Sequence, residues 1–366
     1  MNIIVLSTEH WNAKRQARKE LLYKSLLETR KIDSLLYVEP MRLWWRDRLE
    51  SSQSTSQSGK VAVRRWACLI PGERLAFIQD MNRFWQAKRV ERELETGASY
   101  VGIFYHPVNW LVAKRLKKQA KWYFDWTEDW GVYQNSSEVA NMQIKAIKES
   151  DGVITVSESL YKRACTIRGS DDDVLLLPNA TALDMTMDNP KLEPSYLSGI
   201  SSPRLGLMGH IGPWMDAELI VQLAKAQEDW QWCILGDARG DVRRQLDLCA
   251  NVHLLGIHPY QQLPDFMAYM DVLVAPYNNQ AQGDSSKLYD YLVSGKPVVS
   301  SEIDTASRLS EVVATAHTLQ QWLDEIQKAF DETDVGMLEK RRSMARLCTW
   351  QARAEELLEW FNLKRY

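Results

Sequence analysis

The segment from Asp284 to Val299 carries the residues best suited to chemistry on an anionic ligand. Ser285 and Ser286 favour the start of a helix, and the glycine and the valine pair near its end predict a stop and a following strand. Free amides and the dipole at a helix N-terminus bind anions, and Lys287 adds a positive charge. Asp290 lies one turn further along the same face, where a carboxylate can accept both hydroxyls of a ribose. The segment therefore predicts a nucleoside diphosphate site, with an exposed ion pair between Lys287 and Asp290 as the alternative.

A second candidate is the glycine-containing stretch from Gly206 to Gly212, which includes Gly209 and follows a predicted strand. Its spacing differs from the dinucleotide GxGxxG, so an NAD site is disfavoured. Glycines at this place still let the backbone approach a phosphate closely. A tight turn without a ligand is the alternative interpretation.

A third candidate is a cluster of three carboxylates, Asp125, Glu128 and Asp129, between tryptophans at the end of a predicted strand. Aromatic rings stack on the apolar face of a sugar, and a carboxylate can orient or deprotonate an acceptor hydroxyl. The cluster therefore predicts a sugar-binding and catalytic role. Solvated loop acids are the alternative.

Several other classes of protein are disfavoured by what the sequence lacks. There is no P-loop, HExxH, GxSxG or kinase signature, the 6 histidines show no metal-ligand spacing, and the 5 cysteines are odd in number and widely spaced. No metal site is expected. The longest apolar run is about six residues against the roughly 20 that cross a bilayer, and a secretory signal is absent. These features predict a cytoplasmic protein.

These candidate residues need a scaffold of strands that alternate with helices, as in a doubly wound α/β sheet. Strands are expected at residues 3–6, 34–38, 101–105, 122–124, 153–156, 174–177, 205–208, 232–235, 253–255, 272–275 and 297–300, and helices at 14–30, 217–227, 263–269 and 351–363. The polar stretch 51–60 is expected to be a mobile loop. Prolines between 178 and 203 place a linker at 183–202, between domains at 1–182 and 203–345. The helix within 346–366 is expected to pack back on the first domain.

Residues 203–301 resemble the donor domain of a GT-B glycosyltransferase of the glycosyltransferase family 4 type. The resemblance rests on the order of short motifs: GHIG at 209–212, ILGD at 234–237, NVHLLG at 251–256, HPY at 258–260, DVLVAPY at 271–277, KLYDYL at 287–292 and GKPVV at 295–299. More loosely, Trp11, YVEP at 37–40, the acid cluster, VITVS at 153–157 and the Pro178-Asn179 pair resemble the branch with teichuronic acid glycosyltransferases. This implies two Rossmann-like domains that face each other across a cleft.

The resemblance implies a retaining, metal-independent transferase for cell-surface polysaccharide synthesis, with a nucleotide diphosphate sugar as co-substrate and no other cofactor. UDP is the expected nucleotide because it is common in that branch, and a glycan or lipid-linked glycan is the expected acceptor. Catalytic roles fall to Lys287, Glu128, Asp129 and Asp125. Donor contacts fall to Gly209, His210, Ile211, Gly236, Asp237, His258, Pro259, Tyr277, Ser285, Ser286, Leu288 and Asp290. Acceptor contacts fall to Glu9, His10, Trp11 and His106.

One departure from the family pattern keeps other functions open. The two glutamates that the family places eight residues apart are replaced by Gln282 and Asp290. A non-catalytic nucleotide- or glycan-binding protein on the same fold, or a UDP-sugar epimerase, therefore remains an alternative.

The charge distribution predicts where the protein works. Residues 1–125 hold 23 Lys and Arg against 13 Asp and Glu, although the net charge of the chain is -3. Many of these cations alternate with aromatic residues at 42–48, 64–66, 83–89 and 114–122. Such a pattern favours a headgroup interface, and no nucleic-acid-binding motif accompanies it. We therefore expect the first domain to attach to an anionic bilayer at the inner face of the plasma membrane, with a solvated helical face as the alternative.

Overall fold

The structure is a computed structural model of the chain, and it describes residues 1–11, 18–41, 54–55, 60–68, 70, 75–183, 192–279 and 283–364. It divides into two compact units. The first comprises Met1–Pro178 and Arg353–Tyr366, and the second comprises Asn179–Ala352. The division after Pro178 falls four residues before the expected end of the first domain, and residues 183–202, expected as a linker, belong to the second unit.

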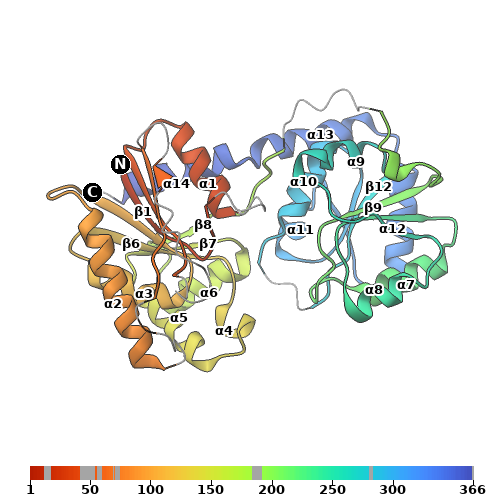
Figure 1. Cartoon of the computed structure of the whole chain (residues 1–366). Coiled ribbons are helices and arrows are strands. Elements are labelled where there is room, and N and C mark those ends of the chain that lie inside the picture. Colours follow the sequence, from red (N-terminus) through yellow and green to blue (C-terminus); the bar gives the residue numbers. More distant parts are fainter. Residues whose placement is uncertain are drawn as a thin grey trace. The chain divides into compact units, whose positions relative to one another are not determined.

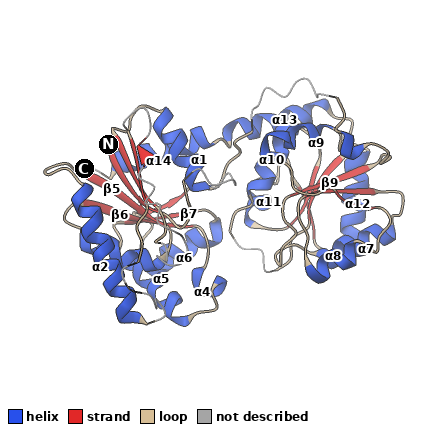
Figure 2. Ribbon diagram, in the orientation of Figure 1, coloured by secondary structure: helices blue, strands red, loops and turns tan. Residues whose placement is uncertain are grey.

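The first unit is built on a sheet with strand order β3-β4-β2-β1-β5-β6-β7-β8, drawn in Figures 1 and 2. Neighbouring strands are parallel, apart from the antiparallel pair of β3 and β4. The strands are β1 (Asn2–Leu6), β2 (Ser34–Val38), β3 (Ser54–Thr55), β4 (Val61–Arg64), β5 (Tyr100–Phe104), β6 (Ala120–Trp126), β7 (Gly152–Thr155) and β8 (Val174–Leu176). Because the chain winds outward in both directions from β1 and β5, the topological switch point lies between these two strands.

Helices cover both faces of this sheet (Figure 1). They are α1 (Arg18–Glu28), α2 (Ala76–Glu93), α3 (Trp110–Ala113), α4 (Trp130–Tyr133), α5 (Ser137–Glu149), α6 (Glu158–Arg168) and the last part of α14 (Trp350–Leu363). The end of α14 packs on β6, since the ring of Trp360 lies 5.2 Å from that of Tyr123. Two short 3-10 helices, η1 (Pro107–Asn109) and η2 (Lys114–Leu116), flank α3.

The second unit contains a parallel sheet with strand order β11-β10-β9-β12-β13-β14. Its strands are β9 (Arg204–Met208), β10 (Gln231–Leu235), β11 (Val252–Leu254), β12 (Val272–Ala275), β13 (Val298–Ser301) and β14 (Ala314–Ala316). This is the 3-2-1-4-5-6 order of a dinucleotide-binding fold, with its switch point between β9 and β12. Ligands of such sheets bind beyond the carboxyl ends of the strands on either side of that point.

The helices of the second unit are α7 (Ala217–Ala226), α8 (Gly240–Leu246), α9 (Leu263–Ala268), α10 (Ser286–Ser294), α11 (Asp304–Arg308), α12 (Leu319–Phe330) and α13 (Val335–Leu347), with 3-10 helices η3 (Ser195–Leu197) and η4 (Tyr260–Gln262). Helix α10 packs against α9 and α13, and α7 packs against α8 and α12. Asp216 caps α7 by accepting from the Leu219 amide at 2.9 Å. Gly295 ends α10 with φ of +75°, a conformation that glycine adopts without steric cost.

The expected strands are present within one or two residues. The helices expected at 217–227, 263–269 and 351–363 correspond to α7, α9 and α14, whose ends differ from the expected ones by at most one residue. Helix α1 begins at Arg18 among the described residues, so the start expected at residue 14 lies outside them. The stretch expected as a mobile loop, 51–60, contains β3 at 54–55, and most of its other residues lie outside the description. Strands β4 and β14 were not expected, because both are short and neither has a long apolar run. In the sheets, β14 is an edge strand, whereas β4 lies between β3 and β2.

Candidate functional site

The loops after β9 and β10 meet at the carboxyl edge of the second sheet. The Gly209 amide donates to the Leu235 carbonyl at 2.9 Å, and the Ile211 amide donates to the Asp237 carbonyl at 2.8 Å. The exposed His210 ring also lies 2.8 Å from the Asp237 carbonyl through Nδ1. Five of the expected donor residues, Gly209, His210, Ile211, Gly236 and Asp237, are therefore brought together at the switch point.

Close backbone contact explains the glycines in these two loops. A Cβ atom on Gly236 would lie 2.0 Å from the Gly209 carbonyl oxygen, so no larger residue fits. Gly209 has φ of +95°, and a Cβ there would lie 2.9 Å from Cε of Lys287. The glycines therefore allow two loops and one lysine side chain to converge in a small space.

Lys287 extends from the first turn of α10 to this point. Its Nζ lies 3.5 Å from Sδ of Met215 and 5.4 Å from the centre of the Tyr277 ring. Among the described residues, no carboxylate lies within 4.0 Å of this half-buried ammonium. Burial lowers the pKa of Lys287 to about 8. The cation thus lies in an environment that would favour an incoming anion.

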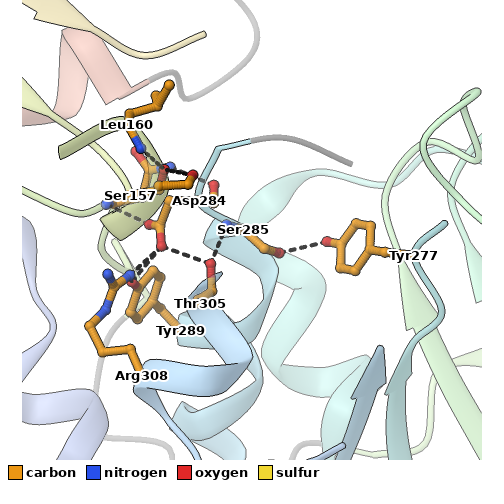
Figure 3. Close-up of polar contacts among 10 residues, drawn as sticks. Ser157, Leu160, Tyr277, Asp284, Ser285, Tyr289, Thr305 and Arg308 are labelled. Carbon is orange, nitrogen blue, oxygen red and sulfur yellow. Dashed lines mark hydrogen bonds and ion pairs between the residues drawn. The ribbon is translucent and has the colours of Figure 1, made fainter. Parts of the chain in front are cut away.

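The start of α10 offers backbone hydrogen-bond donors next to Lys287. Ser285, the N-cap residue, makes no side-chain hydrogen bond to the first turn, because its hydroxyl lies 2.6 Å from the Tyr277 hydroxyl instead (Figure 3). The Ser285 amide donates to the Thr305 hydroxyl at 2.8 Å. The amides that follow, those of Ser286 and Lys287, are free of capping by the N-cap side chain, and the helix dipole favours a negative charge beside them.

Asp284, which sequence reasoning did not single out, is the centre of the hydrogen-bond network at this helix start (Figure 3). Its side chain is fully buried, and Oδ1 accepts from the Thr305 hydroxyl at 2.7 Å, from the Tyr289 hydroxyl at 2.9 Å and from Arg308. Oδ2 accepts from the Asn179 amide at 2.7 Å. An acid just before a predicted helix was visible in the sequence, but its partners lie far away in the chain.

Asp290 does not form the exposed ion pair with Lys287 that the sequence left open as an alternative. It is buried, and it accepts from the Tyr260 hydroxyl at 2.7 Å. Burial raises the pKa of Asp290 to about 7, although hydrogen bonds from Tyr260 and Thr181 oppose the effect. Tyr260 follows His258 and Pro259, so the structure brings this loop to Asp290 rather than bringing Asp290 to Lys287.

The remaining donor candidates divide between surface and core. His258 contacts the Leu255 carbonyl at 3.1 Å, and its ring lies 4.3 Å from that of Tyr196. Leu288 is fully buried in the core, so its side chain is not available to a ligand. Gln282 lies outside the described residues.

In the first unit, three of the four expected acceptor residues follow β1, and two of them contact Glu39, which follows β2. Glu39 accepts from the Trp11 amide at 2.9 Å, lies 3.1 Å from Nδ1 of His10 and pairs with Arg65. Burial alone would raise the pKa of Glu39, but the bonds from Arg65 and His10 outweigh it and hold the pKa below its ordinary value. Glu39 therefore fixes the loop that carries His10 and Trp11, and sequence reasoning missed this role.

Lys19, also missed, lies at the switch point of the first sheet. Its buried ammonium contacts Glu9 at 3.0 Å and the Thr8 hydroxyl, and it lies 4.9 Å from the centre of the Tyr105 ring. His106 follows Tyr105 and accepts from the Val108 amide through Nδ1 at 3.2 Å. Burial, helped by nearby cations, lowers the pKa of His106 to about 4, so this ring is neutral at pH 7.

The three acids after β6 have three different environments. Asp125 is fully buried and pairs with Arg18 at 3.3 Å. Asp129 caps α4, accepts from Gln143 at 3.0 Å and pairs with Arg163, and these bonds hold its pKa below the ordinary value against the opposing effect of burial. Glu128 is exposed, and desolvation, with a smaller effect of Glu9, raises its pKa against the opposing effect of Lys19. Of the three, Glu128 is the carboxylate that a ligand could reach.

Two further properties concern the described residues as a whole. None of their helices combines the length and the apolar character of a membrane span. Within the same ranges, no three His, Cys, Asp or Glu side chains are grouped as a metal site requires. A cavity of about 220 Å³ lies in the second unit between the start of β13 and α12, but none of the candidate residues lines it.

The fold and the switch-point geometry define a class of protein. Residues 213–332 match the family described as glycosyl transferases group 1. The matched residues lie within the second unit, and the solved structures that resemble the whole chain show the GT-B fold of two Rossmann-like units. The expected resemblance and fold class are both confirmed.

Several individual proteins are similar to this chain. A protein of Bacillus subtilis (strain 168), named as a teichuronic acid biosynthesis glycosyltransferase, TuaH, is 23% identical over 242 residues, which are 62% of this chain and 61% of the relative. The match thus spans less than two thirds of that protein. HepE of Anabaena in complex with UDP and glucose has a TM-score of 0.72 and 15% identity, with 99% of both chains covered. Sucrose-phosphate synthase of Thermosynechococcus elongatus has a TM-score of 0.73 and 14% identity, with 99% of this chain and 98% of that chain covered.

Proposed function

We propose that the protein transfers a hexose from a UDP-sugar to a hydroxyl of a glycan or lipid-linked glycan, with retention at the anomeric carbon and without a metal ion. The observation that carries this proposal is the position of Lys287, which lies over Gly209 at the β9–β12 switch point beside the uncapped start of α10. In the reaction, the bond between the anomeric carbon and the β-phosphate oxygen breaks, and a bond from that carbon to the acceptor oxygen forms.

Such a site must above all stabilise the negative charge on the departing diphosphate. The diphosphate gains negative charge as the bond breaks, and prepositioned amides and a cation lower the barrier most where that charge develops. In a single-step transfer with retention, the acceptor attacks from the face that the diphosphate leaves. The departing phosphate oxygen is then the nearest base for the acceptor proton, so the chain need only hold the two groups together.

The choice of UDP and of a polysaccharide acceptor rests on the relatives. HepE is known in complexes with UDP and with UDP-glucose, and TuaH is named for teichuronic acid biosynthesis. A lipopolysaccharide outer core galactosyltransferase, WaaB, shares the fold with a TM-score of 0.69 and 11% identity over the full length of both chains. Each of these names points to a nucleotide sugar or to a cell-surface glycan.

The carboxyl edge of the first sheet is proposed to bind the acceptor. Glu128 is exposed there, and the second oxygen of Glu9 is buried without a hydrogen bond to any residue in the described ranges. Carboxylate oxygens of this kind accept hydrogen bonds from sugar hydroxyls. The exposed part of His10, 43% of its side chain, adds a second type of polar group.

Attachment to the inner face of the plasma membrane is proposed through helix α2. Its exposed surface includes Phe77, Phe84 and Trp85, which are 67%, 42% and 42% exposed, together with Lys88. Aromatic rings and cations suit a headgroup interface. Trp122 does not belong to this surface, because it is fully buried in the core. Residues 42–48, also expected in the cluster, lie outside the described ranges.

A donor panel tests the proposal directly. The protein is incubated with UDP-, GDP- and dTDP-sugars, with and without glycan and lipid-linked acceptors, and release of nucleoside diphosphate is measured with and without a chelator. We expect acceptor-dependent release from a UDP-sugar that the chelator does not change, and a product whose anomeric configuration matches the donor. Lys287→Ala should lower turnover by roughly 10²- to 10³-fold. Lys296→Ala, at the other end of α10, is the matched control.

The second candidate is a binding protein without transferase activity. The engagement of Asp290 by Tyr260 favours it, because that carboxylate is then not free for a ribose. Binding without release across the whole panel would support this function. A UDP-N-acetylglucosamine 2-epimerase from Listeria monocytogenes is named among the structures of the same fold, with a TM-score of 0.60 and 12% identity. Donor isomerisation without an acceptor would identify that activity here.

A further inference from the structure

Asp284 connects two parts of the second unit that serve different purposes. One is the start of α10, where the diphosphate site is proposed. The other is residues 179–183, which we call the crossing segment because the chain enters the second unit there, after Pro178. Oδ1 of Asp284 faces the helix start through Thr305, and Oδ2 faces the crossing segment through the Asn179 amide at 2.7 Å.

On the helix side, the contacts fix the backbone that precedes the anion site. The Thr305 hydroxyl donates to Asp284 and accepts from the Ser285 amide at 2.8 Å. Ser285 is the N-cap residue of α10. Because its amide is held by Thr305, the backbone that leads into the first turn is held in place, and with it the amides of that turn. Arg308 compensates the buried charge of Asp284, because a buried carboxylate is tolerated when it is paired and hydrogen-bonded.

On the other side, the crossing segment is tied to α10 twice. The Asn179 side chain donates to the Asp284 carbonyl at 2.8 Å, in addition to the amide contact with the carboxylate. The Ala182 amide donates to the Tyr260 hydroxyl at 3.3 Å, and that hydroxyl donates to Asp290 in the middle of α10. Two acids, Asp284 just before α10 and Asp290 within it, therefore hold both ends of a short segment, the second of them through Tyr260.

We propose that Asp284 is a positioning residue that couples the diphosphate site to the crossing segment, so that a bound nucleoside diphosphate stiffens residues 179–183. The inference rests on the proposed function, because it takes the ligand and its site from there. A ligand that orders the start of α10 also orders the Asp284 carboxylate, which contacts both the helix start and the crossing segment. Binding at one site then changes the free energy of the other.

For the variant Asp284→Asn, the positioning role and simple electrostatics predict opposite changes in UDP affinity. Asp284→Asn removes a negative charge near an anion site and leaves Arg308 without its partner. Charge alone would then strengthen UDP binding. A positioning role predicts weaker binding, by roughly tenfold, because losing a hydrogen bond to a charged group costs about as much as that change in affinity.

Titration calorimetry with UDP and amide hydrogen exchange of residues 179–183 test the proposal together. In the wild type, we expect UDP to slow exchange in the crossing segment. In Asp284→Asn, we expect weaker UDP binding, faster exchange in the free protein and little UDP-dependent slowing. Asp229→Asn, which changes an exposed acid at the amino end of β10, is the matched control and should behave as the wild type.

Two further variants keep the test decisive if Asp284→Asn does not fold. Thr305→Val removes only the helix branch, so UDP binding should weaken while exchange of the free crossing segment stays at the wild-type rate. Asn179→Ala removes a contact of the crossing branch, so exchange should rise and UDP-dependent slowing should fall. UDP that binds the wild type and slows exchange in α10 but not in residues 179–183 would overturn the coupling alone. Absence of binding by any nucleoside diphosphate would overturn the proposed function with it.

Discussion

The side chain of Lys287 crosses the backbone at Gly209 so closely that a Cβ atom on Gly209 would lie 2.9 Å from the lysine Cε. The two residues come from different elements, α10 and the loop after β9, which meet at the switch point of the second sheet. A positive φ at Gly209 and the absence of its side chain are both needed for this approach. The relationship places a cation beside the backbone amides expected to hold a diphosphate.

Gly209→Ala should weaken binding of UDP by at least roughly tenfold. The new methyl group displaces the lysine, and an alanine in this region of φ adds about 1–2 kcal/mol of strain. Titration calorimetry measures the affinity. Gly199→Ala is the matched control, because Gly199 has φ of +83° in the same unit but no atom within 4 Å of the added carbon. Equal effects of both substitutions on UDP affinity would show that strain alone is responsible.

The pH dependence of the reaction should report the ionisation of Lys287. Its pKa is lowered to about 8 by burial, so the ammonium is present below that pH and is lost above it. We expect kcat/KM, which reports groups of the free enzyme, to fall as pH rises through about 8. Lys287→Arg keeps its charge at every accessible pH, so this variant should be slower but should lose the alkaline fall. An unchanged alkaline limb in the variant would assign the fall to another group.

Asp290→Asn should change how stability depends on pH. The folded carboxyl has a pKa of about 7, raised by burial, whereas the unfolded value is near 3.8. Between these values the folded state holds a proton that the unfolded state releases, so wild-type stability falls as pH rises to about 7 and is level above it. Relative to the variant, the wild type should lose about 2–3 kcal/mol between pH 5 and pH 8, at about 1.4 kcal/mol per pKa unit. Urea unfolding at the two pH values measures this, and parallel curves would contradict it.

The parts of the fold that could be predicted from the sequence are those fixed by local pattern. The central strands are continuous apolar runs, and α10 has polar residues at its start and Gly295 at its end, so both were predicted closely. The contacts of Asp284 could not be predicted in this way. Its partners Thr305, Arg308 and Asn179 lie 21, 24 and 105 residues away, and only the folded sheet brings them together.

The acid cluster at residues 125–129 also shows what the sequence could not predict, namely which of its acids remains accessible. Asp125, Glu128 and Asp129 are alike in the sequence, but pairing with Arg18 and Arg163 engages the first and the third. Both arginines come from helices that are distant in the chain. Residue type and spacing could therefore locate the cluster but could not select Glu128 within it.

Membrane attachment should depend on the aromatic residues of α2. We expect the protein to sediment with anionic liposomes at low salt, and less at high salt or with neutral liposomes, because headgroup attraction is screened by ions. Replacing Phe84 and Trp85 by serine should reduce sedimentation. Leu248→Ser, at a residue of the second unit that is 81% exposed, is the control. Equal and negligible sedimentation in all four conditions would indicate a soluble acceptor instead.

The position of the diphosphate tests the central claim most directly. A crystal structure of the protein with UDP would give the distance from Nζ of Lys287 to the nearest β-phosphate oxygen. We expect about 3 Å, the length of a charge-assisted hydrogen bond, with the phosphate at the first amides of α10. A diphosphate bound elsewhere, with Lys287 still against Met215 and out of reach of the phosphate, would contradict the assignment of this site.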